Sequence, residues 1–386
     1  MQSLNIAFSW FLFSLLFVGT QQILLTSKCS CYDRTTDCSF RQMLAIQGRD
    51  LCSQTSTWKL RGNTLRQLPQ NRFSGKLDLS KNEFGLNKRF WINPEPLSEL
   101  DASDNYFSDL SFAKPVWDCS LSVLNVSNNR ISILDKTLDR CRSILVFRIA
   151  NNKLSRLNDD SFSKQELLQF LDLAGNPLKS ISPKTFSAQK RLLTLDMSNT
   201  HLSDLPVGIF SELTLLQHLH LSGSNFTKLP TSVFSSLKSL VTLYLQRNAI
   251  RELQPGIFDS LFQLKVLDLD NNQLQHLPPT LFHRLHSLEH LSARSNHLRT
   301  LPSLRLCSAP LRIALFSDNA ITAVDEDDLR ALWRPGFQLA DITNNPVESC
   351  SFKWANSSPD INVFTEGSLV KIGMEVMDRG IIWIQN

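Results

Sequence analysis

The leucines between residues 240 and 301 recur with a fixed period. Leucine or a close relative fills L-x-x-L-x-L before Asn248, Asn272 and Asn296, and x-L-x-x-L after each of them. These three asparagines are spaced evenly, since 272 − 248 and 296 − 272 are both 24. An internal period within the window of about 20–50 residues is typical of stacked structural units. The pattern therefore predicts a repeat array in this part of the chain.

The same register extends in both directions and covers most of the sequence. The aligned positions are Asn63, Asn82, Asn105, Asn129, Asn152, Asn176, Thr200, Ser224, Asn248, Asn272, Asn296, Asn319 and Asn345. Each unit is expected to hold a short strand at L-x-L, with the leucines inward and the alternate residues outward. A later F-x-x-L segment predicts a short helical or 3₁₀ turn, because the prolines that follow several units discourage a long helix.

The asparagine of each unit is predicted to hydrogen-bond backbone groups of the adjacent turn. Buried backbone polar groups require such partners, and the side-chain amide can serve several of them. Thr200 and Ser224 carry shorter polar groups in this register. We therefore expect these two neighbouring rungs of the ladder to be weaker than the rest.

Residues 58–347 resemble the typical-type leucine-rich repeats of extracellular proteins, the class found in Toll-like receptor ectodomains and secreted leucine-rich-repeat proteins. The resemblance implies an α/β solenoid shaped as a horseshoe. A curved parallel β-sheet would line the concave face, short helical or 3₁₀ turns the convex face, and a cysteine-rich cap the N-terminal end. Because one fold hosts many partners, the motif indicates the fold more specifically than the function.

The boundaries of the array define four segments. Residues 1–20 are predicted to be a signal peptide, since Ile6 to Val18 form an apolar run too short to span a bilayer. The alternative is a buried N-terminal helix. Residues 21–57 form the predicted N-terminal cap, 58–347 the repeats (about 13), and 348–386 a short C-terminal cap built on Trp354, Phe364 and residues 381–384. No second apolar run has the length of a transmembrane helix, so the mature chain is expected to be secreted and extracellular.

Eight cysteines in an exported chain are expected to form disulfides. The resemblance to extracellular caps implies that Cys29 pairs with Cys38 and Cys31 with Cys52. A zinc site is the alternative for these four residues, although their spacing is irregular.

The later cysteines lie in or beyond the repeats. Cys119 and Cys141 fall in adjacent units at similar positions, and neighbouring strands are about 5 Å apart, which suits a disulfide. Two buried free thiols are the alternative. Cys307 and Cys350 either bridge each other or leave one thiol for an intermolecular bond.

Composition limits the possible functions only loosely. The chain has 386 residues, of which 42% are hydrophobic and 20% charged, so a disordered or collagen-like chain is excluded. A net charge of +4, dispersed over 40 basic and 36 acidic residues, gives no reason to expect a nucleic-acid partner. Nucleophile-elbow, phosphate-loop and His-Glu-x-x-His motifs are missing from the sequence, so we predict neither an enzyme nor a cofactor.

A binding site is predicted on the outward strand positions, because they converge on the concave face of such an array. One section departs from the common L-D-L wording and combines Tyr, Arg and His, of which Tyr and Arg are enriched in binding hot spots. It comprises His218, His220, Tyr244, Gln246, Arg247, Asp268, Asp270, His290 and Arg294. The alternative is ordinary solvated surface. A metal site is excluded because His218 and His290 are three repeats apart, about 14 Å, whereas a pH-sensitive interface remains a further hypothesis.

Three Asn-x-Ser/Thr sites, at Asn125, Asn225 and Asn356, are candidate glycan acceptors. Asn125 occupies an outward strand position, so a glycan there would direct a partner to the later repeats.

The predicted function is extracellular binding of a protein, either a ligand or a receptor ectodomain, as a single chain or an oligomer. The resemblance to Toll-like ectodomains favours innate immune recognition. An adhesion, matrix or guidance protein and a soluble inhibitor of an extracellular enzyme are the two alternatives.

Overall fold

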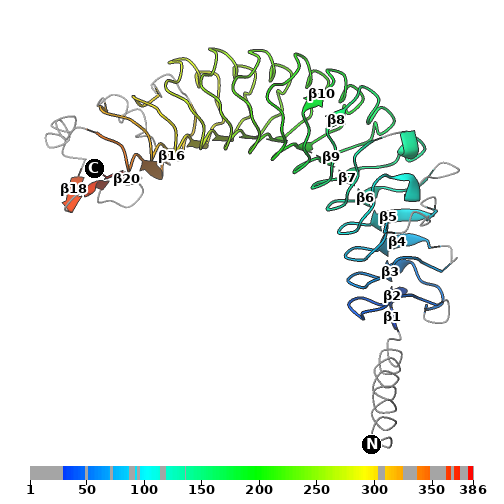
Figure 1. Ribbon diagram of the computed structural model, residues 1–386. Coiled ribbons are helices and arrows are strands. Elements are labelled where there is room, and N and C mark those ends of the chain that lie inside the picture. The colour runs from blue at the N-terminus through cyan, green and yellow to red at the C-terminus, as the bar shows by residue number, and fades with distance from the viewer. Residues whose placement is uncertain are drawn as a thin grey trace, which may run out of the picture.

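The computed structural model describes residues 29–47, 51–69, 73–86, 92–93, 96–113, 119–134, 136–302, 309–324 and 337–347, and three further strands at 362–366, 369–373 and 381–385. Successive turns of the chain stack into an arch with strands along its inner curve (Figure 1). This is the predicted leucine-rich-repeat solenoid.

Each of the thirteen units contributes one strand to the concave sheet, as the period predicts. The strands are β3 (Thr57–Lys59), β4 (Gly75–Asp78), β5 (Leu97–Asp101), β6 (Val123–Asn125), β7 (Val146–Arg148), β9 (Phe170–Asp172), β11 (Thr194–Asp196), β12 (His218–His220), β13 (Thr242–Tyr244), β14 (Val266–Asp268), β15 (His290–Ser292), β16 (Ile313–Leu315) and β17 (Leu339–Asp341).

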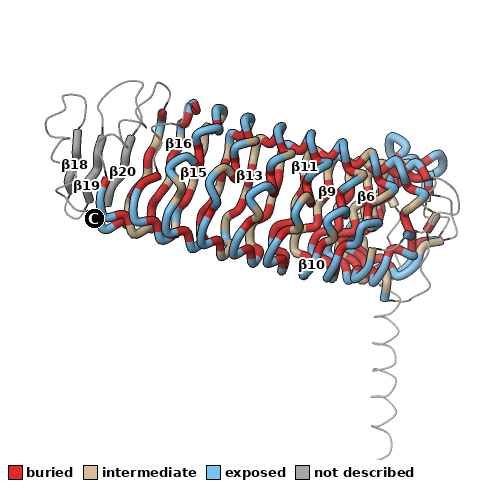
Figure 2. Tube along the Cα trace, turned by 90° about the horizontal axis from the view of Figure 1, so that it is seen from above, coloured by how far each residue is buried: buried red, intermediate tan, exposed pale blue. Residues whose placement is uncertain are grey.

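The strands pair in parallel without a shift in register through the middle of the array. Leu195, Leu219 and Leu243 stand side by side as the central residues of β11, β12 and β13, and all three are fully buried. The residues before and after each central leucine are half-buried on the concave face. The same alternation recurs turn after turn, so buried segments line up along the whole array (Figure 2).

The convex side consists mostly of tight turns. In the F-x-x-L segments the backbone N–H of the leucine donates to the carbonyl of the phenylalanine three residues earlier. Examples are Leu213 N to Phe210 O at 3.1 Å and Leu261 N to Phe258 O at 2.9 Å. True 3₁₀ helices occur in two early units, η2 (Ser111–Ala113) and η3 (Lys136–Leu138). The described residues contain no α-helix. A separate two-stranded sheet, β8 (Arg156–Leu157) with β10 (Ser180–Ile181), lies along one rim.

The asparagine ladder is present as predicted. Asn272 Nδ2 donates to the carbonyls of Leu245 (3.1 Å), Leu269 (3.0 Å) and Asp270 (3.2 Å), while its Oδ1 accepts from Ile250 N at 3.1 Å. Because Leu245 belongs to the preceding unit, the amide joins neighbouring turns.

The ladder changes character in the seventh and eighth units. The Thr200 and Ser224 hydroxyls hydrogen-bond each other at 2.8 Å, and Ser224 Oγ also accepts from Thr200 N at 3.3 Å. Both residues are buried. Each hydroxyl thus has the other as its hydrogen-bond partner. In the other units, the asparagine side chain donates to backbone carbonyls instead.

The residue just before each ladder position has a left-handed backbone in every unit. This column comprises Gly62, Lys81, Asp104, Asn128, Asn151, Gly175, Asn199, Gly223, Arg247, Asn271, Ser295, Asp318 and Asn344, all with positive φ. Glycine and asparagine adopt this conformation most readily. The positive φ turns the chain out of the concave strand toward the rim.

The N-terminal cap is a hairpin of β1 (Ser30–Tyr32) and β2 (Thr35–Asp37), and β2 pairs in parallel with β3. Its disulfides are Cys29–Cys38 and Cys31–Cys52, with Cα separations of 4.5 and 5.9 Å, so the predicted pairing is confirmed. The predicted Cys119–Cys141 bridge between adjacent units is also present, with a Cα separation of 4.9 Å.

At the other end, β20 (Ile381–Gln385) pairs in parallel with β17 and continues the sheet. Two antiparallel partners follow, β19 (Leu369–Gly373) and then β18 (Asn362–Glu366). The segment boundaries proposed from the sequence stay predictions. The signal peptide, Trp354, Asn356, Cys307 and Cys350 lie outside the described residues.

Candidate binding surface on the concave sheet

The most developed side-chain cluster on the concave face spans β11 to β13. Asp196, His220 and Tyr244 are neighbours in the strand register. The His220 and Tyr244 rings meet edge to face with centroids 4.8 Å apart, and His220 Nδ1 lies 3.6 Å from Asp196 Oδ2. Aromatic pairs in this geometry add attraction beyond the area they bury. The cluster is therefore ordered before any partner arrives.

His218 stands beside this cluster at the first position of β12. Its Nδ1 lies 2.9 Å from the Thr242 hydroxyl of the next strand. Burial lowers the pKa of His218 below its usual value, and the nearby His220 lowers it further. His218 is thus held in its neutral form at neutral pH.

Asp172, on the neighbouring strand β9, has a raised pKa. Burial is the main cause, and the carboxylate of Asp196 adds to it. The charges of Arg148, its register neighbour on β7, and of His220 oppose this rise.

A second cluster involves Asp270, which the structure places in a supporting position. Asp270 is buried, with 5% of its surface exposed, and binds the Nε of Arg294 at 2.9 Å and its backbone N at 2.7 Å. The Ser292 hydroxyl also donates to it. Asp270 therefore fixes Arg294, whose side chain is 46% exposed, instead of meeting a partner itself.

Asp268 completes the second cluster from strand β14. Its Oδ1 accepts a hydrogen bond from Asp270 N at 2.9 Å. Burial raises the pKa of the Asp268 carboxyl, and the charge of Asp270 raises it further.

Arg247 and Gln246 lie between the two clusters. Arg247 is exposed and takes the left-handed conformation, with φ of 57°, where most other units use glycine, asparagine or aspartate. Such a residue is strained by about 1 kcal/mol, and the turn that every unit makes at this position imposes the conformation. The Gln246 side-chain oxygen is buried without a hydrogen-bond partner among the described residues.

The predicted residues fall in two clusters that adjoin, because Tyr244 and Asp268 are register neighbours on β13 and β14. His218, His220 and Tyr244 form one cluster, and Asp268, Asp270 and Arg294 form the other. His290 belongs to neither, because its register neighbours on β14 and β16 are Val266 and Ile313.

An apolar row on the same face escaped the sequence analysis. Val123, Val146 and Phe170 occupy the first positions of β6, β7 and β9, side by side and half-buried. The guanidinium carbon of Arg148 lies 5.0 Å from the centroid of the Phe170 ring. The signal was available, because apolar residues at outward strand positions are unusual on a solvated sheet.

The candidate glycan acceptors occupy different surfaces. Asn125 is half-buried on the concave face, where its Nδ2 donates to Asp101 Oδ2 at 3.0 Å. Asn225 is exposed just after its ladder position, at the rim. Whether either carries a glycan stays a prediction.

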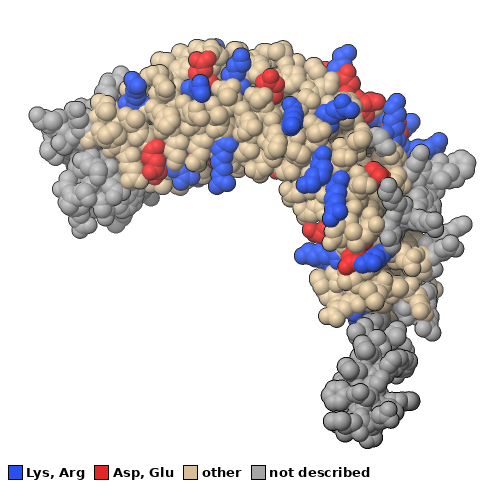
Figure 3. Space-filling model, in the orientation of Figure 1, with Lys and Arg blue, Asp and Glu red and all other residues tan. Residues whose placement is uncertain are grey.

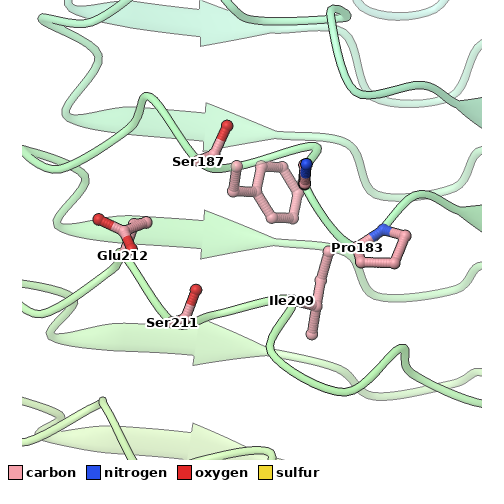
Figure 4. Close-up of a pocket in the computed structure, with 7 residues that line it drawn as sticks. Pro183, Ser187, Ile209, Ser211 and Glu212 are labelled. Atoms are coloured by element: carbon pink, nitrogen blue, oxygen red, sulfur yellow. The ribbon is translucent and has the colours of Figure 1, made fainter.

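On the convex side, a hollow of about 260 Å³ lies between two successive turns. Figure 4 shows Pro183 and Ser187 on one turn and Ile209, Ser211 and Glu212 on the next. Among the residues that the structure describes, no group of three or more His, Cys, Asp or Glu side chains could hold a metal ion. No described helix is long and apolar enough to cross a membrane.

Comparison with known proteins identifies the repeats. Five overlapping segments match the model of the leucine rich repeat family, 119–178, 168–226, 190–250, 216–261 and 238–298. No curated protein matches the sequence.

Solved structures share the fold at low sequence identity. A leucine-rich-repeat protein of Leptospira interrogans is 20% identical with a TM-score of 0.64, and the match covers 88% of this chain and 96% of that one. Toll in its glycosylated complex with Spatzle, described as a hub in Drosophila development and innate immunity, is 21% identical with a TM-score of 0.67. This match covers 80% of the chain but only 42% of Toll. An internalin of Listeria monocytogenes is 16% identical with a TM-score of 0.58, covering 83% and 84%. The chain therefore carries leucine-rich repeats in a solenoid of the kind that these proteins share.

Proposed function

We propose that this chain is a secreted module that binds another protein through its concave sheet, in extracellular recognition and innate immunity. The observation that carries the proposal is the ordered cluster of Asp196, His220 and Tyr244 at the centre of that sheet. Thirteen strands at about 4.8 Å spacing make a face on the order of 60 Å long, which fits a protein better than a small substrate.

Disulfides support the extracellular location. Bonds such as Cys29–Cys38 and Cys119–Cys141 form and persist in oxidising compartments. The predicted signal peptide agrees with this location. The fold shared with Toll, which is described in complex with Spatzle, makes an immune ligand or receptor the leading kind of partner.

The partner is expected to bridge two regions of the face. Tyr244 and Arg247 form the central contact, and the apolar row of Val123, Val146 and Phe170 extends it toward the N-terminal repeats. An adhesion or guidance protein, or an inhibitor of an extracellular enzyme, would use the same surface.

The experiment is capture from native extracellular fluid on immobilised protein, with two matched baits. Tyr244→Ala combined with Arg247→Asn removes the central contact and should retain less than about a tenth of the partner. Lys81→Asn is the control, because Lys81 has the same left-handed conformation as Arg247 in a distant unit. A partner held equally by both baits would place binding elsewhere.

Three further observations separate the roles. Transcript induction by microbial challenge supports immune recognition, whereas constitutive expression in neural or connective tissue supports adhesion or guidance. Inhibition of one member of a purified enzyme panel supports the inhibitor.

A further inference from the structure

One rim of the solenoid carries basic residues in three successive turns without an acidic residue among them. We call residues 128–134, 151–157 and 175–181 the basic rim. Its charged residues are Arg130, Lys153, Arg156 and Lys179, all of them exposed. Asp109 and Asp204 lie in the turns before and after, and Asp159, whose carboxylate accepts from Lys184 N at 3.3 Å, borders it on one side.

Stacking brings these four side chains together although the sequence spreads them over fifty residues. Lys153 N donates to Ile131 O at 2.8 Å, and Lys179 N donates to Ser155 O at 2.9 Å. Arg156 pairs with Ser180 in the small β8–β10 sheet. The turns are thus locked one repeat apart, about 5 Å.

The four bases keep their charge available for a ligand. None of them forms an ion pair with an acidic residue in the described part of the chain. Arg130 stacks on Tyr106 with its guanidinium carbon 4.7 Å from the ring centroid, which orients the group without neutralising it. Figure 3 shows Lys and Arg side chains, with Asp and Glu side chains among them, over the face of the arch that carries β8 and β10.

The opposite rim of the same turns carries both basic and acidic residues. Its bases Arg140, Lys164 and Lys190 are interleaved with acids, and Lys190 Nζ lies 3.6 Å from Glu212. The net charge of +4 for the whole chain does not reveal that the two rims differ in charge.

We propose that the basic rim binds a sulfated polysaccharide, in addition to any protein on the concave face. A row of like charges on neighbouring turns attracts a linear polyanion over several contacts. This choice of polyanion rests on the proposed extracellular location, where nucleic acid and the anionic lipids of the cytoplasmic leaflet are not the available polyanions. An array on an open rim, without an apolar pocket, fits an extended chain of sulfate groups.

The test measures affinity for immobilised heparin by surface plasmon resonance. The rim variant Arg130→Ser/Lys153→Ser/Arg156→Ser/Lys179→Ser should bind at least about tenfold more weakly and show a shallower dependence on salt, because fewer counterions are released. The matched control Arg140→Ser/Arg142→Ser/Lys164→Ser/Lys190→Ser removes the same charge from the opposite rim, where Arg142 is the exposed neighbour of Arg140. It should stay within about twofold of the unmodified protein, since its bases are interleaved with acids.

Circular dichroism and thermal unfolding establish that both variants are folded. Chemically desulfated heparin should bind more weakly than heparin. Three results would each overturn the proposal: an equal loss of heparin affinity in the two variants, an unchanged heparin affinity in the rim variant, or a preference for phosphatidylserine vesicles over heparin. Retention of the concave-face partner by the rim variant separates this site from the proposed function.

Discussion

Two neighbouring stretches of the ladder solve the same structural problem differently. Around Asn272 one amide bonds four backbone groups and thereby joins adjacent turns. Around Thr200 and Ser224 two hydroxyls bond chiefly each other. The leucines on both sides are equally buried. A continuous apolar spine can therefore coexist with an interruption in its polar ladder, and the two contributions to stability can be measured separately.

The largest expected effect comes from removing an intact rung. Asn272→Ala leaves buried backbone groups without a partner, at about 1–3 kcal/mol each, so we expect a loss of about 3 kcal/mol or more. Thr200→Ala removes a single hydroxyl and should cost about 1 kcal/mol. Urea unfolding of both variants at unchanged m-value gives the comparison. An equal loss of unfolding free energy in both variants would show that the asparagine and the hydroxyl pair contribute equally to stability.

A smaller effect concerns coupling between Thr200 and Ser224. Because their hydroxyls bond each other, the double alanine variant should lose less than the two single variants together, with a coupling energy of about 1 kcal/mol. The cycle of Thr200→Ala with Asn272→Ala, three repeats apart, serves as the control and should be additive. A coupling energy between Thr200 and Asn272, with none between Thr200 and Ser224, would contradict the hydrogen bond between the two hydroxyls.

The smallest expected effect depends on pH and lies in the same pair of units. His218 has a lowered pKa in the folded protein, chiefly through burial. Its neutral form therefore favours folding, and this stability is present above the unfolded pKa of about 6.5 and lost as the pH falls below it.

His218→Gln should accordingly flatten the fall in unfolding free energy between pH 7 and pH 5. Thr194→Ser, on the adjacent strand, removes no titratable group and should keep the original slope. A slope that is identical in all three proteins would contradict the inferred role of His218.

The fold was predictable because it depends on a period. Asn248, Asn272 and Asn296 repeat the same local chemistry, so one unit predicts the next. The cap pairing of Cys29 with Cys38 followed from resemblance to related caps and is confirmed. The short turns predicted for the convex side are also present, as hydrogen-bonded turns in the F-x-x-L units and as 3₁₀ helices at Ser111–Ala113 and Lys136–Leu138.

The candidate site was predictable only in part, because its properties arise between repeats. Asp270 reads as an outward acid in its own unit, but Arg294 of the next unit encloses it. The strain at Arg247 follows from a backbone conformation that the side chain does not reveal. Likewise, the stacking of the turns brings together Arg130, Lys153 and Lys179, which are far apart in the sequence.

The hairpin at the N-terminal end changes the strand direction of the sheet. β1 runs against β2 and against every repeat strand beyond it. The strand next to the first repeat on this side is therefore β2 of the cap, and β1 beyond it reverses the direction that the repeat strands share. The parallel sheet of the repeats thus ends in a cap of different strand direction, which the two disulfides Cys29–Cys38 and Cys31–Cys52 hold together.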